Sequence, residues 1–422
     1  MIFWPRVLTA AVCLSLMACG PSEVTGRDVL PTPKKVREPG IYMPQPPVAF
    51  ETSREVLGVR CDSELNGESS PLGPHYRFKF TLDERATSFV MVPFVTRGRV
   101  SAVSMQTPTR PVNLVTYYRH HNLRVAELAS YDYGGVGTYG EITFDWPILV
   151  PYAPQHSLLV VGGGDYELVV STDQEAPCLY VMPGYKGDTL DLNFHFVGTE
   201  DINAKRAPDD ADLQAVLNRV REIYAQAGVK LGKVRYYDLP DEPAELYTVL
   251  RSLNDINALT AYGAAPAASL DGHLSLDVFL VSDLQLDEDA SVLGYSPSLP
   301  GAPGMHGHAK NGVVFSTLDL GRFNNNVAHI MAHEIGHYLG LRHTTELVYG
   351  LEGQLADQVD AMFGLLDPIE DTPDCPLILT HTLECADFEN LMFPFAPMAA
   401  FNFTPFISSE QSQVLRANPL VK

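Results

Sequence analysis

The stretch Ala328–His343 reads AHIMAHEIGHYLGLRH, and its spacing decides how this part of the chain folds. Residues four apart lie on the same face of a helix, so His333 and His337 would point in one direction. Gly340 can adopt a positive φ and end the helix, after which the chain turns back. That turn would bring His343 to the same point as the two helical histidines. The spacing therefore predicts three imidazoles around one position.

This arrangement matches the needs of a hydrolytic zinc centre. Three neutral histidine nitrogens hold zinc and leave a fourth position for water, whose pKa the metal lowers toward neutrality. Glu334 would lie about 100° further round the helix, beside the metal and not on it. From there its carboxylate can take a proton from the water and deliver it to the leaving amine. We therefore predict Glu334 as the catalytic residue, and a degenerate zinc site without activity is the alternative. The predicted metal ligands are His333, His337 and His343.

The pattern HExxHxxGxxH, followed later by a methionine-containing turn, resembles the metzincin zinc peptidases. The turn is Asn390-Leu391-Met392-Phe393-Pro394, and the resemblance implies that Met392 packs beneath the metal without binding it. Within the metzincins, the chain is most similar to the bacterial pappalysin-like peptidases. Four stretches carry that similarity: the motif with Tyr338 and Thr344, Asp371-Thr372-Pro373, Asn390-Leu391-Met392, and the tail Ile407–Pro419. The resemblance implies a zinc endopeptidase that acts on protein or peptide substrates.

Two further positions follow from the resemblance. Pro394 stands two residues after the methionine, where several metzincin families have a tyrosine and the matrixins have a proline. Some relatives bind calcium near the Asp-Thr-Pro segment, so Asp367, Glu370 and Asp371 are candidate calcium ligands. A turn with solvated acidic side chains is the alternative.

Residues 56–185 show short runs of alternating apolar residues separated by turn residues, with no long helical period. Short strands at such spacing are typical of an all-β sandwich. The strands are expected at Tyr76–Leu82, Ser88–Val95, Val112–Tyr118, Ser157–Val161 and Tyr166–Ser171. The predicted sandwich looks like the accessory domains of secreted bacterial peptidases, and would either bind a substrate or surface or serve as a structural module.

Residues 186–422 change period and indicate an α/β (α+β) domain with a mixed sheet and an active-site helix. The acidic segment Asp209–Asp212 would start a helix whose apolar face runs over Leu213–Ala227, with Gly228 as its end. Asn324–Asn326 are N-cap candidates for the motif helix, expected from about residue 327. Strands are expected at Leu190–Val197, Lys233–Tyr237, Leu274–Val281, Val292–Tyr295 and Gly312–Ser316. The whole chain is therefore predicted to be multidomain, a β-sandwich followed by a metzincin-type zinc protease domain.

Two features are expected at the rim of the site. Val292–Tyr295 falls where metzincins keep the sheet edge over the cleft, and an extended peptide could pair there as an added strand. His306 and His308 stand in a glycine- and proline-rich loop and could touch substrate or metal. Solvated loop histidines are the alternative.

The first 18 residues have the layout of an export signal, with one cation before an apolar stretch. Leu16-Met17-Ala18-Cys19-Gly20 resembles the lipobox of bacterial lipoproteins, which implies that Cys19 is acylated and anchored in a membrane. Residues 19–55 are rich in proline and read as an extended tether. We expect an exported protein, lipid-anchored to the bacterial cell envelope at the outer membrane, with the side that it faces left open. A plain secretory signal is the alternative.

Cys13 leaves with the signal and Cys19 would be acylated, so four cysteines remain, and an even number in an exported protein indicates two disulfides. Of the three pairings, we favour Cys61 with Cys178 and Cys375 with Cys385, because each pair brackets one plausible unit. A rival reading notes that the segment around Cys61 is faintly like the cysteine switch of matrixin proenzymes, in which a thiolate occupies zinc.

Composition sets the outer limits. A chain of 422 residues with 45% hydrophobic residues can form two ordinary globular domains. The net charge of −22 argues against a nucleic-acid partner, because phosphate backbones require Lys and Arg.

Two alternatives to the endopeptidase stay open. One is a surface binding lipoprotein with a vestigial zinc site, which the intact Glu334 disfavours, and the other is a hydrolase of a non-peptide amide. Cleavage specificity and oligomeric state have no readable signal.

Overall fold

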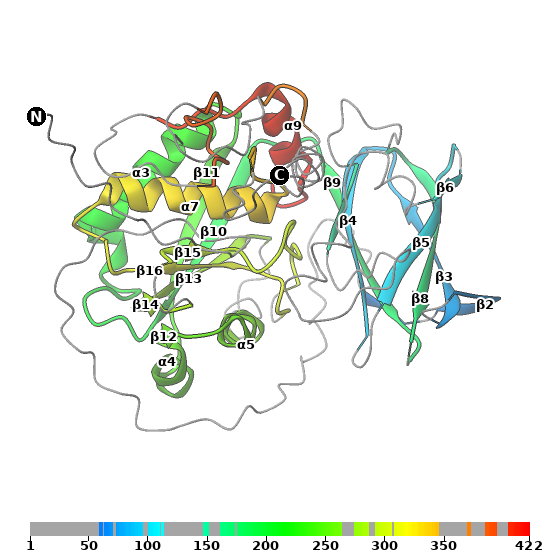
Figure 1. Ribbon diagram of the computed structural model, residues 1–422, viewed down its shortest axis with the longest axis horizontal. Helices are drawn as coiled ribbons and strands as arrows, with labels where there is room; N and C mark the ends of the chain where they lie inside the picture. The colour runs from blue at the N-terminus through cyan, green and yellow to red at the C-terminus, as the bar shows by residue number, and fades with distance from the viewer. Residues whose placement is uncertain are drawn as a thin grey trace, which may run out of the picture.

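The computed structural model describes residues 59–61, 63–70, 73–95, 100–109, 111–113, 147–151, 161–173, 175–263, 274–286, 292–305, 308–345, 369–372, 385–394 and 404–422. The chain is a mixture of several β-sheets and a smaller number of helices (Figure 1). No helix in these ranges is long and apolar enough to cross a membrane. The predicted signal and tether, including Cys19, lie outside the described residues.

Two antiparallel sheets form the part of the molecule on the right of Figure 1, and we call them the N-terminal sheet pair. One has the order β1-β9-β4-β7 and the other β2-β3-β8-β5-β6. Their strands are β1 (Val59–Arg60), β2 (Glu64–Ser70), β3 (Gly73–Leu82), β4 (Ala86–Phe94), β5 (Val100–Gln106), β6 (Pro111–Asn113), β7 (Ile148–Val150), β8 (Gly164–Thr172) and β9 (Cys178–Tyr185). The two sheets pack through aromatic rings. The ring centroid of Phe89 of β4 lies 5.8 Å from that of Phe80 of β3 and 5.6 Å from that of Tyr166 of β8. Alternation along β3 explains this layer, because Phe78, Phe80 and Leu82 are buried and the residues between them are not.

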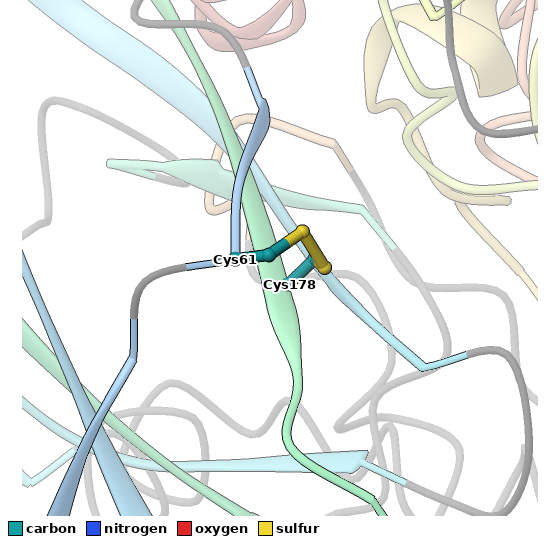
Figure 2. Close-up of a disulfide and its surroundings, with 2 residues drawn as sticks. All are labelled: Cys61 and Cys178. Carbon is teal, nitrogen blue, oxygen red and sulfur yellow. A yellow bond between two sulfur atoms is a disulfide. The ribbon is translucent and has the colours of Figure 1, made fainter.

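A disulfide joins Cys61, which follows β1, to Cys178 at the start of β9 (Figure 2). The two strands are already paired, with Val59 opposite Tyr180. Because the sulfur of Cys61 is bonded to Cys178, it is not a thiolate that could occupy a metal, and the cysteine-switch reading is wrong. Cys385 is also disulfide-bonded, whereas Cys375 lies outside the described residues, so the second pairing stays a prediction.

A five-stranded sheet of order β11-β10-β13-β16-β15 organises the rest of the chain. Its strands are β10 (Thr189–Val197), β11 (Lys230–Asp238), β13 (Leu276–Val281), β15 (Gly294–Tyr295) and β16 (Val313–Ser316). Neighbours run parallel except β15, which lies at the edge and runs antiparallel to β16. The sheet is therefore mixed. A separate parallel pair consists of β12 (Val249–Leu250) and β14 (Asp283–Leu284).

Helices cover both faces of the five-stranded sheet (Figure 1). On one face lie α3 (Ala211–Ala225), which follows the short helix η1 (Ala207–Asp209), and α7 (Asn324–Leu339). On the other face lie α4 (Asp241–Tyr247) and α5 (Leu253–Gly263). Helix α9 (Ser409–Ala417) contacts α7. Strand β13 alternates between two cores, with Leu276, Val278 and Leu280 toward α7 and with Phe279 and Val281 toward α5. The motif helix is thus held on the apolar face of the sheet.

The start of α3 agrees with the sequence-based expectation, whereas several other elements differ from it. Helix α3 has Asp210 as its N-cap, in the acidic segment that was predicted to start it. Helix α7 begins earlier than expected with Phe323 at the N-cap, so the prediction that asparagines cap it is wrong. The side chain of Asn324 instead accepts the N–H of Gly321 and donates to Asp212 of α3. Strand β15 is shorter than expected, and the segments 114–118 and 157–160 of two predicted strands lie outside the described residues.

The N-terminal sheet pair packs directly against the C-terminal end of α7. Tyr180 of β9 donates a hydrogen bond to the carbonyl of Pro303, and Ser88 of β4 donates to the carbonyl of Ala417 at the end of α9. A Cβ placed on Gly340 would lie 3.1 Å from the Leu149 side chain of β7. The turn that leads from the motif helix toward His343 is therefore in contact with the sheet pair.

Candidate metal centre

Helix α7 carries three buried polar side chains in its second half: His333, Glu334 and His337. The helix ends at Gly340, whose φ of 118° is in the region that favours glycine. The N–H of Gly340 donates to the carbonyl of Gly336, and so does the N–H of the next residue. This tight closure satisfies the last carbonyls of the helix and turns the chain back. His343, also buried, therefore returns to the face of α7 that carries the other two histidines.

The three imidazoles meet at their Nε2 atoms. The Nε2 of His343 lies 3.1 Å from the Nε2 of His333 and 3.1 Å from the Nε2 of His337. Nitrogens bound to one tetrahedral zinc at 2.0–2.1 Å lie about 3.3 Å apart, so the spacing fits a single ion. Within the described part of the chain, these three residues are the one group of three or more potential ligands that come together. The cluster can hold a metal ion.

Backbone carbonyls fix the orientation of two of the rings. The Nδ1 of His333 lies 2.7 Å from the carbonyl of Leu391, and the Nδ1 of His337 lies 2.8 Å from the carbonyl of Leu341. A carbonyl only accepts hydrogen bonds, so each Nδ1 carries the proton and donates it. The Nε2 of each ring then presents its lone pair to the centre, as metal ligation requires.

Burial also sets the charge of these rings. It lowers the pKa of His333 and of His337 well below the usual value of 6.5, and the neighbouring histidines lower it further. The hydrogen bonds to the Leu391 and Leu341 carbonyls act in the opposite direction but are the weaker influence. Both imidazoles are therefore neutral at neutral pH, which is the form that binds a metal.

Met392 lies beneath the helix at the position between the first two histidines. It is fully buried, and a Cβ placed on Gly336 would lie 2.8 Å from its sulfur. A larger residue at position 336 would therefore force the Met392 side chain or its turn to shift. The turn itself is held by the N–H of Met392, which donates to the side chain of Asn390.

Helix α9 fastens this turn to the body of the protein. The side-chain amides of Asn390 and Gln411 donate to each other at 3.0 and 2.9 Å, and both residues are buried. The N–H of Leu391 donates to the carbonyl of Phe406, just before α9. The carbonyl that orients His333 therefore belongs to a segment with fixed ends.

Glu334 lies between α7 and the edge strand. A Cβ placed on Gly294 of β15 would lie 2.9 Å from the Cγ of Glu334. The absence of a side chain at position 294 therefore makes room for the carboxylate arm. The structure brings Glu334 to the antiparallel edge of the sheet, where the sequence predicted the rim of a cleft.

Other predicted site residues lie elsewhere. Asp371 accepts hydrogen bonds from the Ser408 hydroxyl and the Glu410 N–H, so both its oxygens cap the start of α9. Asp367 lies outside the described residues, and calcium binding stays a prediction. His308 accepts the Lys310 N–H at its Nδ1 and is not in the histidine cluster. His306 lies outside the described residues, as does Cys19.

The sequence reasoning missed several residues that build the centre. Gly336 and Gly294 matter because Met392 and Glu334 pack against them, which is visible only in the structure. Asp387 also gave no signal, although it accepts hydrogen bonds from both threonines that follow His343. A glycine inside a helix is the one available hint, because it costs helix stability unless close packing requires it.

The comparisons with known proteins are weak. No protein-family model matches this chain, and no curated protein matches its sequence. Among solved structures, a chaperone–substrate complex matches 42% of this chain and 28% of its own chain, at 13% identity and a TM-score of 0.26. Metalloproteinase-II from Bacteroides fragilis matches 72% of this chain and 80% of its own, at 13% identity and a TM-score of 0.24. Structural similarity at these TM-scores says nothing about function, which depends on the geometry of the site.

Proposed function

We propose that this protein is a zinc-dependent endopeptidase of the metzincin type, most like the bacterial pappalysin-like peptidases. The observation that carries the proposal is the convergence of three Nε2 atoms, two of which have their lone pairs turned inward by carbonyl partners. Glu334 on the same helix and the packing of Met392 against Gly336 support it. The proposal depends on these side chains and not on likeness to solved structures.

Each residue has a role that follows from its position. Zinc, when bound, would polarise a substrate carbonyl and supply an activated water. His333, His337 and His343 would hold the ion in their neutral forms. Glu334 would accept the proton of the water and later return it to the leaving amine. Its burial between α7 and β15 keeps bulk water away from that proton transfer.

The edge strand favours a peptide as the substrate. β15 pairs with β16 on one side, and no other described strand pairs with it. An extended peptide could add to this edge through main-chain hydrogen bonds. Because Gly294 of β15 lies against Glu334, such a peptide would run past the catalytic carboxylate. This supports peptide bonds over non-peptide amides.

The surrounding architecture belongs to the same proposal. We propose that residues 56–185 are a β-sandwich accessory domain and that residues 186–422 are the metzincin-type catalytic domain. Residues 1–18 would be a lipoprotein signal and Cys19 the lipid anchor, with residues 19–55 as a tether to the outer membrane. The lipobox sequence supports the anchor, and a mass measurement of the N-terminal peptide of the native protein tests it.

The test of the function compares the parent protein with Glu334→Ala. Both are produced without the first 21 residues and assayed on unfolded casein and a peptide library, and bound zinc is measured in both. We expect cleavage by the parent, about one zinc per chain in both, and a loss of at least roughly a thousandfold in the variant.

Two other outcomes would change the interpretation. If both proteins hold zinc and neither cleaves any substrate, the surface binding lipoprotein with a vestigial site becomes the better explanation. If the parent holds no zinc after reconstitution, the three histidines are not a metal site and the proposal fails.

A further inference from the structure

A buried carboxylate joins the loop of the third histidine to the turn that contains Met392. Asp387 is 2% exposed, and its Oδ2 accepts hydrogen bonds from the hydroxyl of Thr344 at 2.5 Å and of Thr345 at 2.6 Å. Thr344 directly follows His343 in the chain, and its N–H donates to the carbonyl of Met392. Asp387 therefore lies beside the metal centre, on the segment that closes it.

The other carboxylate oxygen of Asp387, Oδ1, is buried and lacks a hydrogen-bond partner among the described residues. No Lys, Arg or His of the described chain forms an ion pair with Asp387. A buried carboxylate without a cationic partner is strongly unfavourable, so its persistence calls for a positive charge nearby.

The metal centre lacks the negative charge that would balance a bound zinc ion. A zinc ion brings two positive charges, and three neutral imidazoles bring none. Glu334 supplies one negative charge in the same buried region. Asp387 is a second buried carboxylate, so Glu334 and Asp387 together match the two charges of the ion, while Arg342 adds a positive charge near His337. Buried charges are little screened by salt, so this balance acts over a longer range than it would on the surface.

We propose that Asp387 is the second counter-charge of the metal centre and stabilises the bound dication without touching it. The inference rests on the proposed zinc site and adds to it a positioning residue. The backbone supports the placement, because the N–H of Asn390 donates to the carbonyl of Asp387 at 2.7 Å. The counter-charge, the carbonyl that orients His333 and the buried Met392 thus belong to one short, tied segment.

The variant Asp387→Asn separates charge from shape. It keeps an acceptor oxygen for the threonine hydroxyls and removes the negative charge. We expect zinc affinity, measured by chelator competition, to fall about ten- to a hundredfold. The melting temperature of the metal-free protein should stay the same or rise, because an unpartnered buried charge has been removed. The rise in melting temperature on adding zinc should shrink.

Two matched controls use the same region of the chain. Glu389→Gln removes an equal charge two residues away, where the side chain is exposed to water. Its zinc affinity should stay within twofold of the parent. Thr345→Val removes one hydroxyl donor and keeps the charge of Asp387. Its zinc affinity should change by less than threefold, even if the metal-free protein becomes less stable.

The outcomes separate the inference from the proposed function. Zinc binding by Asp387→Asn with parental affinity overturns the counter-charge. So does an equal loss of affinity in Thr345→Val, which would show that geometry and not charge matters. A large fall in the metal-free melting temperature of Asp387→Asn would assign the residue a purely structural role. If the parent itself binds no zinc, the proposed function fails. This result differs from zinc binding by both the parent and Asp387→Asn, which overturns the counter-charge alone.

Discussion

At the scale of single residues, burial controls how the histidines of α7 respond to acid. His329 lies one turn before His333, and burial, with a smaller contribution from Arg219, lowers its pKa from 6.5 to about 4. Between those two values the unfolded chain binds a proton that the folded chain does not. The free energy of unfolding therefore falls as the pH drops from 6.5 toward 4, and is unaffected by this group above 6.5.

This predicts a measurable difference between the parent and His329→Gln. Urea unfolding of both metal-free proteins at pH 7.5 and pH 4.5 gives the loss of stability on acidification. The parent should lose about 2–3 kcal/mol more than the variant, the amount that corresponds to the pKa shift. Equal losses in the two proteins would mean that His329 is protonated in the folded state.

The same scale shows what the sequence can reveal about a site. His333, His337 and His343 follow from spacing, because helix geometry and one glycine turn are enough to bring them together. Asp387 could not be predicted, since it contacts the site through Thr344 across a separation of 43 residues. Contacts of that kind depend on the path of an irregular segment, for which the sequence has no periodic signal.

At the scale of elements, helix α9 is expected to stabilise the metal centre from a distance. Gln411 is fully buried and exchanges hydrogen bonds with Asn390, and its Oε1 also accepts the N–H of Ser408. In Gln411→Ala the amide of Asn390 would lose its partner, and each unsatisfied buried group costs about 1–3 kcal/mol. We expect a loss of about 2–4 kcal/mol in the free energy of unfolding, and faster release of zinc.

A second glutamine on the same helix is the control. Gln413 is half-buried, and Gln413→Ala should change stability by less than about 0.5 kcal/mol. Urea unfolding and stopped-flow zinc release with a coloured chelator measure both quantities. Loss of stability in Gln411→Ala with unchanged zinc release would show that α9 supports the fold and not the turn of Met392.

Element prediction succeeded where one face of an element is buried against a core. The apolar period of α3 and the alternation in β3 are visible in the sequence because each packs one face against the core. Helices α4 and α5 were not predicted, and both are short segments on the far face of the sheet. Strand β9 was missed too, because it is buried along nearly its whole length and shows no alternation.

At the scale of the whole molecule, the N-terminal sheet pair packs against the segment that leads to the metal centre. Leu149 of β7 packs against Gly340, and the turn at Gly340 carries the chain to His343. Tyr180 and Ser88 add hydrogen bonds across the same junction. The sheet pair is therefore expected to support the third ligand, whatever else it binds.

Leu149→Ala tests this connection against Leu168→Ala. Both leucines are buried in the sheet pair, but Leu168 lies on β8, in the sheet that does not carry Leu149. Each truncation should lower the free energy of unfolding by about 2–5 kcal/mol, because each leaves a cavity. Under native conditions, where both variants are folded, zinc should leave Leu149→Ala at least about threefold faster than the parent, since the cavity lies under the turn before His343. Zinc release from Leu168→Ala should match the parent. Identical release from both variants would mean that the sheet pair is an independent module, and that the closure of the metal centre depends on α7, α9 and the Met392 turn alone.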